Sequence, residues 1–402
     1  MLTTIEAIGR IAAEMPRFDA VAVPLDHARR RVLRQRVTAE RDQPPFDRVM
    51  MDGIALAHRA FAGGQRSFRV EGSQHAGDPR QTLLESDACI EVMTGAALPA
   101  GTDCVIPVER LAHANGFVEI EAGYEADLGQ NIHPQGSDHK AGMEVLGPGI
   151  VISPMDIAII ASCGLDRVEV GRQPSVHIIS TGNELVPPGQ PIEPQQIRMS
   201  NGPALLAMLE GQGYTGCEHD HLVDDEALLN DRIAAHLDAA DVLVLSGGVS
   251  MGKADYVPTV LAGLGVRTIF HKISQRPGKP MWFGIGPAGQ AVFALPGNPV
   301  STLVCCRHYV LPALYLASGR PPRAPEHAIL AEPVTFRPAL TCFLPVRLAT
   351  AADGRLRARP VPTNTSGDFT SLGGTDGYVE LALEQSEFPA GSAVPLHRWD
   401  AP

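Results

Sequence analysis

The stretch Asp241–Pro258, DVLVLSGGVSMGKADYVP, constrains the fold of this chain more than any other. It begins with the apolar run Val242–Leu245, and a pair of glycines follows one residue later. A short run of this kind, rich in branched residues, predicts a strand that is buried on both faces. Gly247 and Gly248 would let the backbone turn sharply and direct its N–H groups toward an anion. A plain tight turn between a strand and a helix is the alternative for this stretch alone.

Ser250 and Asp255 follow the two glycines and extend the candidate site. Asp255 stands where the sequence enters an expected helix, just before Tyr256. A strand, a glycine turn and then a carboxylate are typical of a phosphate or oxyanion site at the carboxyl end of a strand. We therefore expect a ligand site at this end of the strand.

Two other stretches have the same construction. Ser175–Ser180 predicts a strand and runs into Thr181-Gly182-Asn183-Glu184, which again ends in a carboxylate. Ala291–Leu295 predicts a third strand and runs into Pro296-Gly297-Asn298-Pro299-Val300-Ser301. In the latter, Asn298 is a suitable helix N-cap, and Pro299 suits the first helical position. Because the carboxyl ends of parallel strands line one crevice of an open sheet, these polar loops predict a single ligand site.

A basic loop, His271–Pro280 (HKISQRPGKP), supplies cations near these acidic loops. Lys272, Arg276 and Lys279 surround a Pro-Gly pair and follow another expected strand, Val266–Ile273. Such a loop can hold phosphate groups, and an arginine can do so with two parallel hydrogen bonds. An ordinary cationic surface loop is the alternative.

Length and charge limit the classes of function. The chain has 402 residues, which predicts two to four domains at roughly 150 residues each. Its net charge is −12, which argues against a general nucleic-acid binder and against an anionic membrane surface as partner. An acidic protein that binds an anionic ligand depends on a few well-placed cations.

Cysteine usage and the N-terminus indicate the compartment. The seven cysteines are scattered and form no C-x-x-C pair, which predicts free thiols in a reducing compartment. The N-terminal sequence MLTTIEAIGRIAAEM lacks the basic and long apolar regions of a signal peptide. We also expect no apolar run close to the ~18 residues of a membrane helix, and therefore a cytoplasmic protein.

The order of expected elements predicts a multidomain α/β protein. Strand and helix patterns alternate over residues 172–320, which predicts a central domain with a parallel sheet. Short β-like segments with glycine turns predict a β-rich insertion domain over residues 46–130. Residues 1–45 and 131–171 are expected to form a discontinuous N-terminal domain, helical and extended, around that insertion. Residues 321–402 predict a small C-terminal β domain.

Taken together, these motifs resemble the molybdopterin molybdotransferases of the MoeA type, which include the gephyrin E domain. Each motif alone would be weak, but they occur in the family's order and span most of the chain. The matching motifs are Met51-Asp52-Gly53, Met93-Thr94-Gly95, Ser180-Thr181-Gly182-Asn183-Glu184-Leu185, Ser246-Gly247-Gly248-Val249-Ser250 with Asp255-Tyr256, Pro277-Gly278-Lys279-Pro280 and Leu295-Pro296-Gly297-Asn298-Pro299-Val300-Ser301.

The resemblance implies the last step of molybdenum cofactor synthesis. Molybdate would be inserted into the dithiolene of adenylylated molybdopterin, with Mg²⁺ or a similar divalent cation, and AMP would be released. The resemblance also implies a homodimer whose site lies between the α/β domain and the partner's β-rich insertion. A molybdopterin adenylyltransferase and molybdoenzyme chaperones are further expected partners, and neither nucleic acid nor membrane is expected.

The resemblance also assigns roles to individual residues. The expected catalytic residues are Asp52, Glu184 and Asp255. Oxygen ligands suit Mg²⁺, and the expected metal ligands are Glu184, Asp224 and Asp255. The expected substrate-binding residues, from the resemblance and from the glycine and basic loops, are Thr94, Asp138, Gly247, Gly248, Ser250, Lys272, Arg276, Lys279, Pro296, Pro299 and Ser366.

Two other functions stay open at this point. A stand-alone molybdopterin adenylyltransferase shares the α/β domain and its Gly-Gly loop, but the Met51-Asp52-Gly53 motif and the outer domains favour the molybdotransferase. A non-catalytic scaffold is the second alternative. The acidic loop residues expected for catalysis are all present, which argues against a scaffold.

Overall fold

The computed structural model describes residues 1–249, 256–322 and 324–400, which fold into two compact units. The larger unit comprises residues 1–34, 148–153 and 167–402, and the smaller comprises residues 35–147 and 154–166. The chain is therefore multidomain, as expected. The boundaries of the four expected domains stay a prediction.

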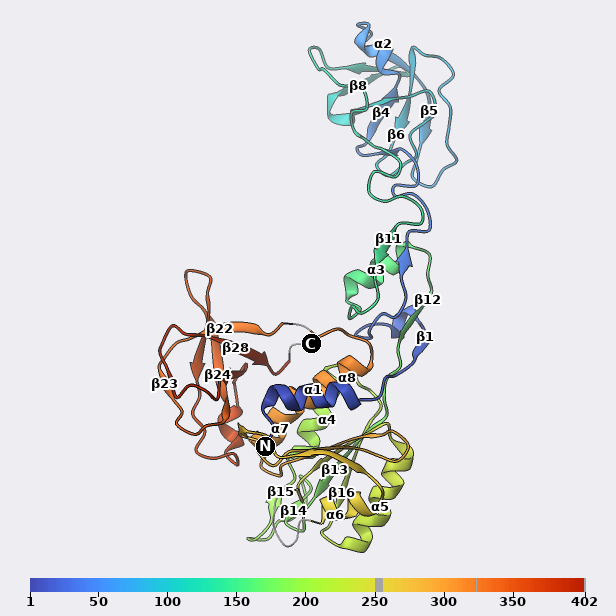
Figure 1. Cartoon of the computed structure of the whole chain (residues 1–402). Helices are drawn as coiled ribbons and strands as arrows, with labels where there is room; N and C mark the ends of the chain where they lie inside the picture. Colours follow the sequence, from blue (N-terminus) through green and yellow to red (C-terminus); the bar gives the residue numbers. More distant parts are fainter. Residues whose placement is uncertain (250–255, 323, 401–402) are drawn as a thin grey trace. The chain divides into compact units, whose positions relative to one another are not determined.

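A six-stranded sheet that includes β13 and β16 forms the centre of the larger unit (Figure 1). Its strand order is β16-β13-β17-β21-β20-β18. The first four of these strands are parallel: β16 (Cys217–Leu222), β13 (Val176–Thr181), β17 (Val242–Ser246) and β21 (Ala291–Leu295). The remaining two, β20 (Trp282–Ile285) and β18 (Arg267–His271), pair antiparallel to their neighbours. The sheet is therefore mixed rather than wholly parallel, because β20 returns directly beside β21.

Helices cover both faces of this sheet because its strands are apolar on both faces. Val176, Ile178, Val242 and Val244 pack with α1 (Thr4–Glu14), α4 (Asn201–Gly211) and the helices α7 (Pro299–Cys305) and α8 (Leu311–Ala317). On the opposite face, Ile179, Leu243 and Leu245 pack with α5 (Glu226–Ala239) and α6 (Val257–Gly263). This alternation along each strand follows directly from the period-two geometry of β-structure.

An ion pair holds the beginning of β17. Both guanidinium nitrogens of Arg172 donate to the Asp241 carboxylate, at 2.7 and 2.8 Å, and the Ser175 backbone N–H also donates to it, at 2.8 Å. The pKa of Asp241 lies below its usual value, mainly because of the hydrogen bonds from Arg172. The entry to the strand is therefore anchored at the end of the sheet opposite the glycine turn.

The strand order places a topological switch between β13 and β17. From β13 the chain crosses through α4 to β16 on one side, and α5 then returns it to β17 on the other side. Loops that leave adjacent strands in opposite directions open a crevice at the carboxyl ends of those strands. Two of the three glycine-containing loops predicted from the sequence, those after β13 and β17, leave the sheet at this point.

The C-terminal residues form a closed β-barrel next to the sheet's helices. Its strands follow the order β24-β25-β22-β28-β26, and β26 pairs back to β24. The short strand β19 (Gln275–Arg276) joins this barrel along β24. The strands are β22 (Glu326–Leu330), β24 (Thr341–Thr350), β25 (Leu356–Pro360), β26 (Gly377–Leu381) and β28 (Ala393–Arg398).

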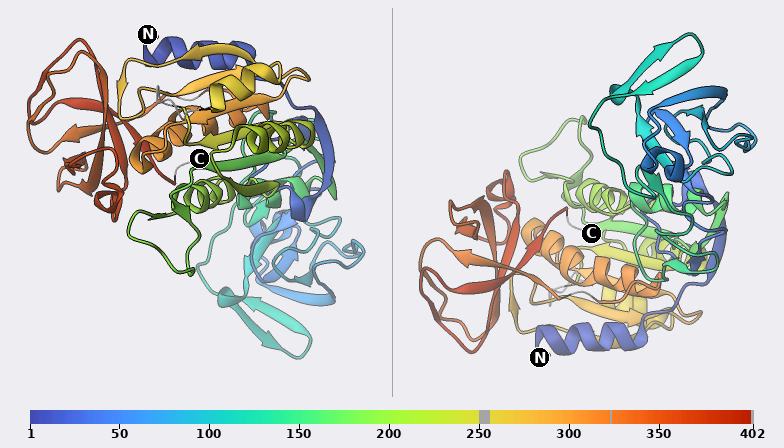
Figure 2. Two further views of the ribbon diagram at one scale, coloured as in Figure 1. Left: turned by 90° about the horizontal axis from the view of Figure 1, so that it is seen from below. Right: turned by 90° about the horizontal axis from the view of Figure 1, so that it is seen from above.

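The barrel packs on the helical run Pro299–Ala317, which contains α7 and α8, through a small shared core. Val300 and Val304 of α7 contact Phe343 of β24 and Tyr378 of β26. Both views in Figure 2 show the red barrel beside the orange helices. The C-terminal β domain expected from the sequence is therefore a barrel that packs against α7.

One helical run is long and apolar enough to resemble a membrane span. The π-helical turn η3 (Cys306–Val310) joins α7 to α8 into one helical run, Pro299–Ala317. Among the described residues, this 19-residue run is the one helix that is long and apolar enough to cross a membrane, by length and composition alone. The expectation that no apolar run approaches this length was wrong. However, 72% of its apolar stretch is buried inside the protein, and a buried core helix can be equally long and apolar, so the run is weak support for a membrane span.

The smaller unit contains a β-rich sheet with the order β7-β4-β6-β5-β9-β8. Its central strands are buried on both faces, with Ala55 and Ile90 in one apolar cluster and Ile54 and Cys89 in another. The elements are β4 (Gly53–Leu56), α2 (His58–Ala62), β5 (Ser67–Gln74), β6 (Ala88–Val92), β7 (Cys104–Pro107), β8 (Leu111–Ala114), β9 (Phe117–Ile120) and α3 (Pro154–Ser162).

Short elements complete both units. In the larger unit β1 (Ala20–Pro24) pairs with β12 (Arg167–Gly171), β14 (Leu185–Val186) with β15 (Ile197–Arg198), and β23 (Val334–Thr335) with β27 (Glu387–Phe388). In the smaller unit β2 (Val37–Thr38) pairs with β11 (Glu144–Leu146), and β3 (Arg48–Val49) with β10 (Ile132–His133). The 3-10 turns are η1 (Leu25–His27), η2 (Val108–Arg110) and η4 (Phe369–Leu372).

Candidate active site

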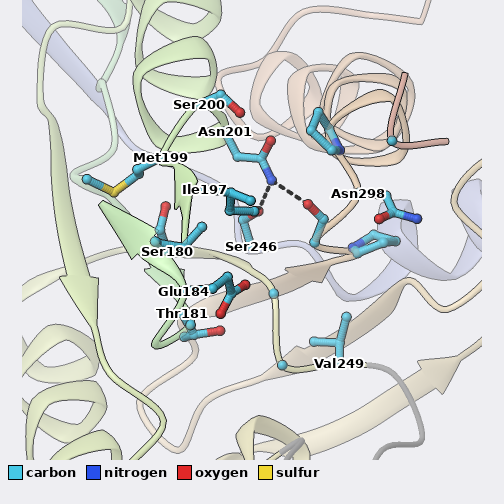
Figure 3. A pocket seen from close by; sticks show the side chains of 18 of the residues that line it. Ser180, Thr181, Glu184, Ile197, Met199, Ser200, Asn201, Ser246, Val249 and Asn298 are labelled. Atoms are coloured by element: carbon cyan, nitrogen blue, oxygen red, sulfur yellow. Dashed lines mark hydrogen bonds between the residues drawn. The ribbon is translucent and has the colours of Figure 1, made fainter. Parts of the chain in front are cut away.

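A pocket of about 690 Å³ opens at the carboxyl edge of the central sheet (Figure 3). The loops that follow β13, β17 and β21 all contribute to its lining, as the sequence predicted from their shared construction. Glu184, Asp224 and the two glycines Gly247 and Gly248 are among the lining residues. The pocket therefore lies at the switch between β13 and β17.

Gly247 and Gly248 adopt backbone conformations that other residues rarely reach. Their φ angles are +105° and +64°. A Cβ on Gly247 would lie 2.7 Å from the Thr181 backbone oxygen, and a Cβ on Gly248 would lie 2.7 Å from a methyl group of Val257. Gly297 packs against the same loop, since its Cβ would lie 3.4 Å from the Gly247 Cα. Glycine is therefore required for the turn and for the close approach of the loops.

Asn201, the first residue of α4, links three walls of the pocket. Its Nδ2 donates to the Ser246 hydroxyl at 2.9 Å, to the Gly297 carbonyl at 2.8 Å and to the Thr302 hydroxyl at 3.2 Å. Figure 3 shows this amide pointing at Ser246. The Asn201 Oδ1 is buried and has no hydrogen-bond partner among the described residues. The side chain therefore joins the ends of β17 and β21 and keeps one acceptor unpaired within the described part of the chain.

Thr181 supplies a second buried polar atom in the pocket wall. The residue is only 4% exposed, and its hydroxyl has no hydrogen-bond partner in the described part of the chain. The hydroxyl lies beside the glycine turn, 2.8 Å from where a Gly247 Cβ would stand. A buried hydroxyl without a partner loses its interactions with water, so a ligand that bonds to it would recover that cost.

The acidic side of the pocket is formed by Glu184 and Asp224. Glu184 is exposed and follows β13, and Asp224 is half-buried and follows β16. The backbone N–H of Asp224 donates to the Asn183 Oδ1 at 3.0 Å, which joins the two loops. The expected metal ligands Glu184 and Asp224 therefore line one pocket.

The barrel contributes one loop to the opposite side. The Asn298 Nδ2 donates to the Ser366 hydroxyl at 2.6 Å, and the Val300 N–H donates to the Ser366 carbonyl at 3.1 Å. Pro296 and Pro299 line the pocket directly, together with Gly367 and Phe369 of the barrel loop. Ser366 thus holds the barrel loop against the start of α7.

Comparison with known proteins agrees with this arrangement. Residues 2–164 match the MoeA N-terminal region (domains I and II), residues 177–315 match a probable molybdopterin binding domain, and residues 327–399 match the MoeA C-terminal region (domain IV). The molybdopterin molybdenumtransferase of Synechocystis is 39% identical over 99% of this chain and 100% of its own length. This chain belongs to the MoeA family. The corresponding protein of Synechococcus elongatus is 35% identical over 93% of each chain.

Solved structures of the MoeA family share the fold. A molybdopterin biosynthesis MoeA protein from Pyrococcus horikoshii is 29% identical in one structure, with a TM-score of 0.81 over 100% of both chains. Another solved structure, of a molybdopterin biosynthesis MoeA protein from Pyrococcus horikoshii OT3, gives the same TM-score of 0.81 at 25% identity and covers 98% of this chain and 99% of that one. The multidomain fold predicted from the sequence is therefore confirmed.

The basic loop of this MoeA protein leaves the same edge of the sheet. β18 runs in the same direction as β21, so residues after His271 lie at the carboxyl edge. Lys272 has φ +76°, and its N–H donates to the Met281 carbonyl at 2.9 Å, which fixes the loop's base. Pro280 lines the pocket, but Lys272, Arg276 and Lys279 are not among the described lining residues. Their predicted contact with substrate stays a prediction.

Three of the predicted residues lie in the smaller unit. The Asp52 Oδ1 accepts hydrogen bonds from the backbone N–H and the hydroxyl of Thr94, both at 2.7 Å. These bonds hold the pKa of Asp52 below its usual value. The Asp138 carboxylate lies 3.0 Å from the His133 Nε2. Asp52 and Thr94 thus form one hydrogen-bonded pair.

Ser250 and Asp255, the other predicted residues of the glycine loop, lie outside the described residues. Sequence reasoning did not single out Asn201 or Thr181 as site residues. Asn201 belongs to none of the motifs described above, and its neighbours Ser246 and Thr302 are distant in the sequence. The one signal for Thr181 was its place inside the motif that ends at Glu184.

Proposed function

We propose that this chain inserts molybdenum into molybdopterin in the synthesis of the molybdenum cofactor. The chain is a molybdopterin molybdenumtransferase by relationship, since relatives of that name are 28–39% identical over nearly its full length. One structural observation supports the proposal most: glycine turns, carboxylates and buried polar atoms that lack partners among the described residues gather in one pocket at the switch between β13 and β17. This is the place at which open α/β sheets bind ligands.

We further propose that the substrate is adenylylated molybdopterin together with molybdate. Both carry oxyanions, which need N–H and hydroxyl donors. The backbone N–H groups of the Gly247-Gly248 turn and the Thr181 hydroxyl would donate to them. Pro296 and Pro299 give the pocket a rigid apolar wall beside these donors. The chain's own residues would therefore bind the substrate oxyanions and orient the dithiolene.

Mg²⁺ is the proposed cofactor, and the donor set fits it. Glu184 and Asp224 offer only oxygen atoms, and Glu184 is exposed to solvent, so a hard cation could keep several of its waters there. When bound, the cation would neutralise charge on the phosphoanhydride and on the leaving AMP. Asp255 is the third proposed ligand. Lys272, Arg276 and Lys279 would bind the same phosphates from the basic loop.

The decisive experiment supplies purified protein with adenylylated molybdopterin, molybdate and Mg²⁺. AMP release and reconstitution of a cofactor-free molybdoenzyme should both depend on all three additions. Consumption of ATP with unmodified molybdopterin, in the absence of molybdate, would instead indicate an adenylyltransferase. Binding of substrate without either reaction would indicate a scaffold.

We also propose a homodimer in which Asp52 serves the partner's pocket. Subunits with Asp52→Ala and with Glu184→Ala would each be inactive, but a mixed dimer would contain one intact site. Two-fold pairing then predicts recovery of about half of the wild-type activity per dimer. Background activity in the mixed dimer would place Asp52 and Glu184 in the same subunit's site, without affecting the proposed reaction.

A reducing cytoplasm is the proposed compartment. All seven cysteines are free, and burial raises the pKa of the Cys89 and Cys104 thiols to about 12. A molybdopterin adenylyltransferase that delivers the substrate and a molybdoenzyme chaperone that accepts the product are the proposed partners. Co-purification of either with the tagged chain tests this proposal.

A further inference from the structure

A second polar cluster lies away from the pocket, where the barrel meets the helical run. His308 comes from η3, Glu380 from β26 and His397 from β28. Each residue offers one ligand atom, and these atoms all lie within 4.8 Å of one another. None of the three is among the described residues that line the pocket.

His308 carries a buried nitrogen without a partner. The residue is 4% exposed, and its Nε2 has no hydrogen-bond partner among the described residues. Its Nδ1 lies 3.0 Å from the Tyr378 hydroxyl. When Nδ1 donates its proton to that hydroxyl, Nε2 presents a bare lone pair. Histidines that bind metals have this arrangement, in which the second ring nitrogen donates to a neighbouring group that fixes the ring.

The other two ligands are already at a suitable separation. The His397 Nε2 lies 3.1 Å from a Glu380 carboxylate oxygen. Two ligands that are each roughly 2.0–2.1 Å from a tetrahedral zinc ion lie about 3.4 Å apart. An ion could therefore replace the proton that His397 and Glu380 share. The separations of up to 4.8 Å in the cluster would have to shorten by about 1.4 Å.

The surroundings enclose the cluster but leave a route to solvent. The His308 ring packs 4.4 Å from the Phe343 ring and 4.8 Å from the His397 ring, measured between centroids. The side chains of His397 and Glu380 keep 20% and 23% exposure, so an ion can reach them. Two imidazoles and one carboxylate suit zinc and similar transition metals, whereas Mg²⁺ prefers oxygen ligands.

We propose that His308, Glu380 and His397 bind a divalent transition-metal ion of the zinc class. The ion ties β26 and β28 of the barrel to the helical run that begins at Pro299 in the pocket wall. Its role is structural: it holds the barrel, and with it the loop around Ser366, against the start of α7. The site is separate in position and in donor chemistry from the proposed Mg²⁺ site.

The first test uses the full chain after removal of bound metal with a chelator. Titration with Zn²⁺ in excess Mg²⁺, followed by calorimetry, should show one ion bound per chain and not displaced by Mg²⁺. Zinc should also raise the melting temperature, because a ligand that binds only the folded state stabilises it. Replacement by Co²⁺ should give the visible absorption of a tetrahedral site without the charge-transfer band of a thiolate. A thiolate band would instead assign the ion to the cysteines and overturn the proposal.

Matched variants locate the ion. Glu380→Gln and His397→Gln each remove one ligand and should weaken zinc binding at least tenfold. Tyr378→Phe keeps the ring but removes the group that orients His308, and should weaken binding by about tenfold. His327→Gln changes an exposed histidine on β22 of the same barrel and should leave binding unchanged. Equal zinc affinity in all four variants and the wild type would overturn the proposal.

A variant that fails to fold, as judged by circular dichroism, does not end the test. Crystals of the wild-type chain soaked in zinc should show an anomalous peak between His308, Glu380 and His397. The absence of that peak, in crystals that bind zinc elsewhere or not at all, would overturn the proposal. Neither result depends on the transferase reaction.

Discussion

Two polar clusters adjoin the same helical run and differ in the exposure and chemistry of their titratable groups. Near its start at Pro299 the pocket presents oxygen atoms, and Glu184 is exposed to water. Near its middle, His308 is buried among aromatic rings, and one of its nitrogens has no partner within the described ranges. An exposed carboxylate can stay charged without a fixed partner, whereas a buried polar atom must find one or destabilise the fold. The comparison predicts that pocket residues control activity and that cluster residues control stability.

Glu184→Gln tests whether pocket residues control activity, and it has the largest expected effect. The substitution keeps the size of the side chain but removes the charge proposed to hold Mg²⁺. Loss of that interaction should lower the rate of AMP release at least about a hundredfold, since metal-assisted charge stabilisation is worth several kcal/mol. The melting temperature should change by only a few degrees because the side chain is exposed. Full activity at saturating Mg²⁺ would remove Glu184 from the metal site.

His308→Ala tests whether residues of the His308 cluster control the stability of the fold. Removal of a buried ring that packs on Phe343, Tyr309 and His397 leaves a cavity, so the free energy of unfolding should fall by about 2–4 kcal/mol in urea denaturation. The same change at exposed His327 serves as the control and should cost less than about 0.5 kcal/mol. Equal losses in the two variants would break the contrast between the clusters.

Asn201→Ala should lower both stability and activity, and so tests whether a pocket residue can contribute to both. Its amide joins Ser246, Gly297 and Thr302, and loss of these bonds should lower the free energy of unfolding by about 1–3 kcal/mol. Displacement of the loops should also reduce the rate of AMP release roughly tenfold, which corresponds to a rise of about 1.4 kcal/mol in the activation barrier. Rates and urea curves measured on the same sample check both effects. A change in stability without a change in rate would restrict Asn201 to a structural role.

Thr94→Val, at the residue that pairs with Asp52 in the smaller unit, should show the smallest effect on folding stability. Hydrogen bonds from Thr94 lower the pKa of Asp52 in the folded protein, so the ionised carboxylate stabilises the fold at pH values above its unfolded pKa. This contribution is lost as the pH falls through the lowered folded pKa. Thr94→Val removes the hydroxyl donor and should raise the pKa of Asp52, measured by NMR titration. An unchanged pKa would show that the backbone N–H alone is responsible.

Local patterns in the sequence were enough for much of the fold and for part of the site. The strands Val242–Ser246 and Ala291–Leu295 follow from short apolar runs, and their loops follow from glycine, proline and asparagine at the ends. The meeting of Glu184, Gly247 and Pro296 at one sheet edge could also be predicted, because the three loops follow strands of similar construction in a parallel sheet. Asp224 was expected there only from the family resemblance. The antiparallel return of β20 could not be predicted, because no local signal distinguishes it.

Tertiary packing alone decided the remaining contacts. His308 and Tyr378 are 70 positions apart, and Asn201 and Thr302 are 101 apart, yet each pair is hydrogen-bonded. The sequence pattern around His308 is that of an apolar core helix, so the residue gave no signal of a polar partner. Its neighbours were set by where the barrel packs on that helix. Hydrophobic burial brings the two surfaces together without regard to sequence distance, and the polar groups that they carry meet as a consequence.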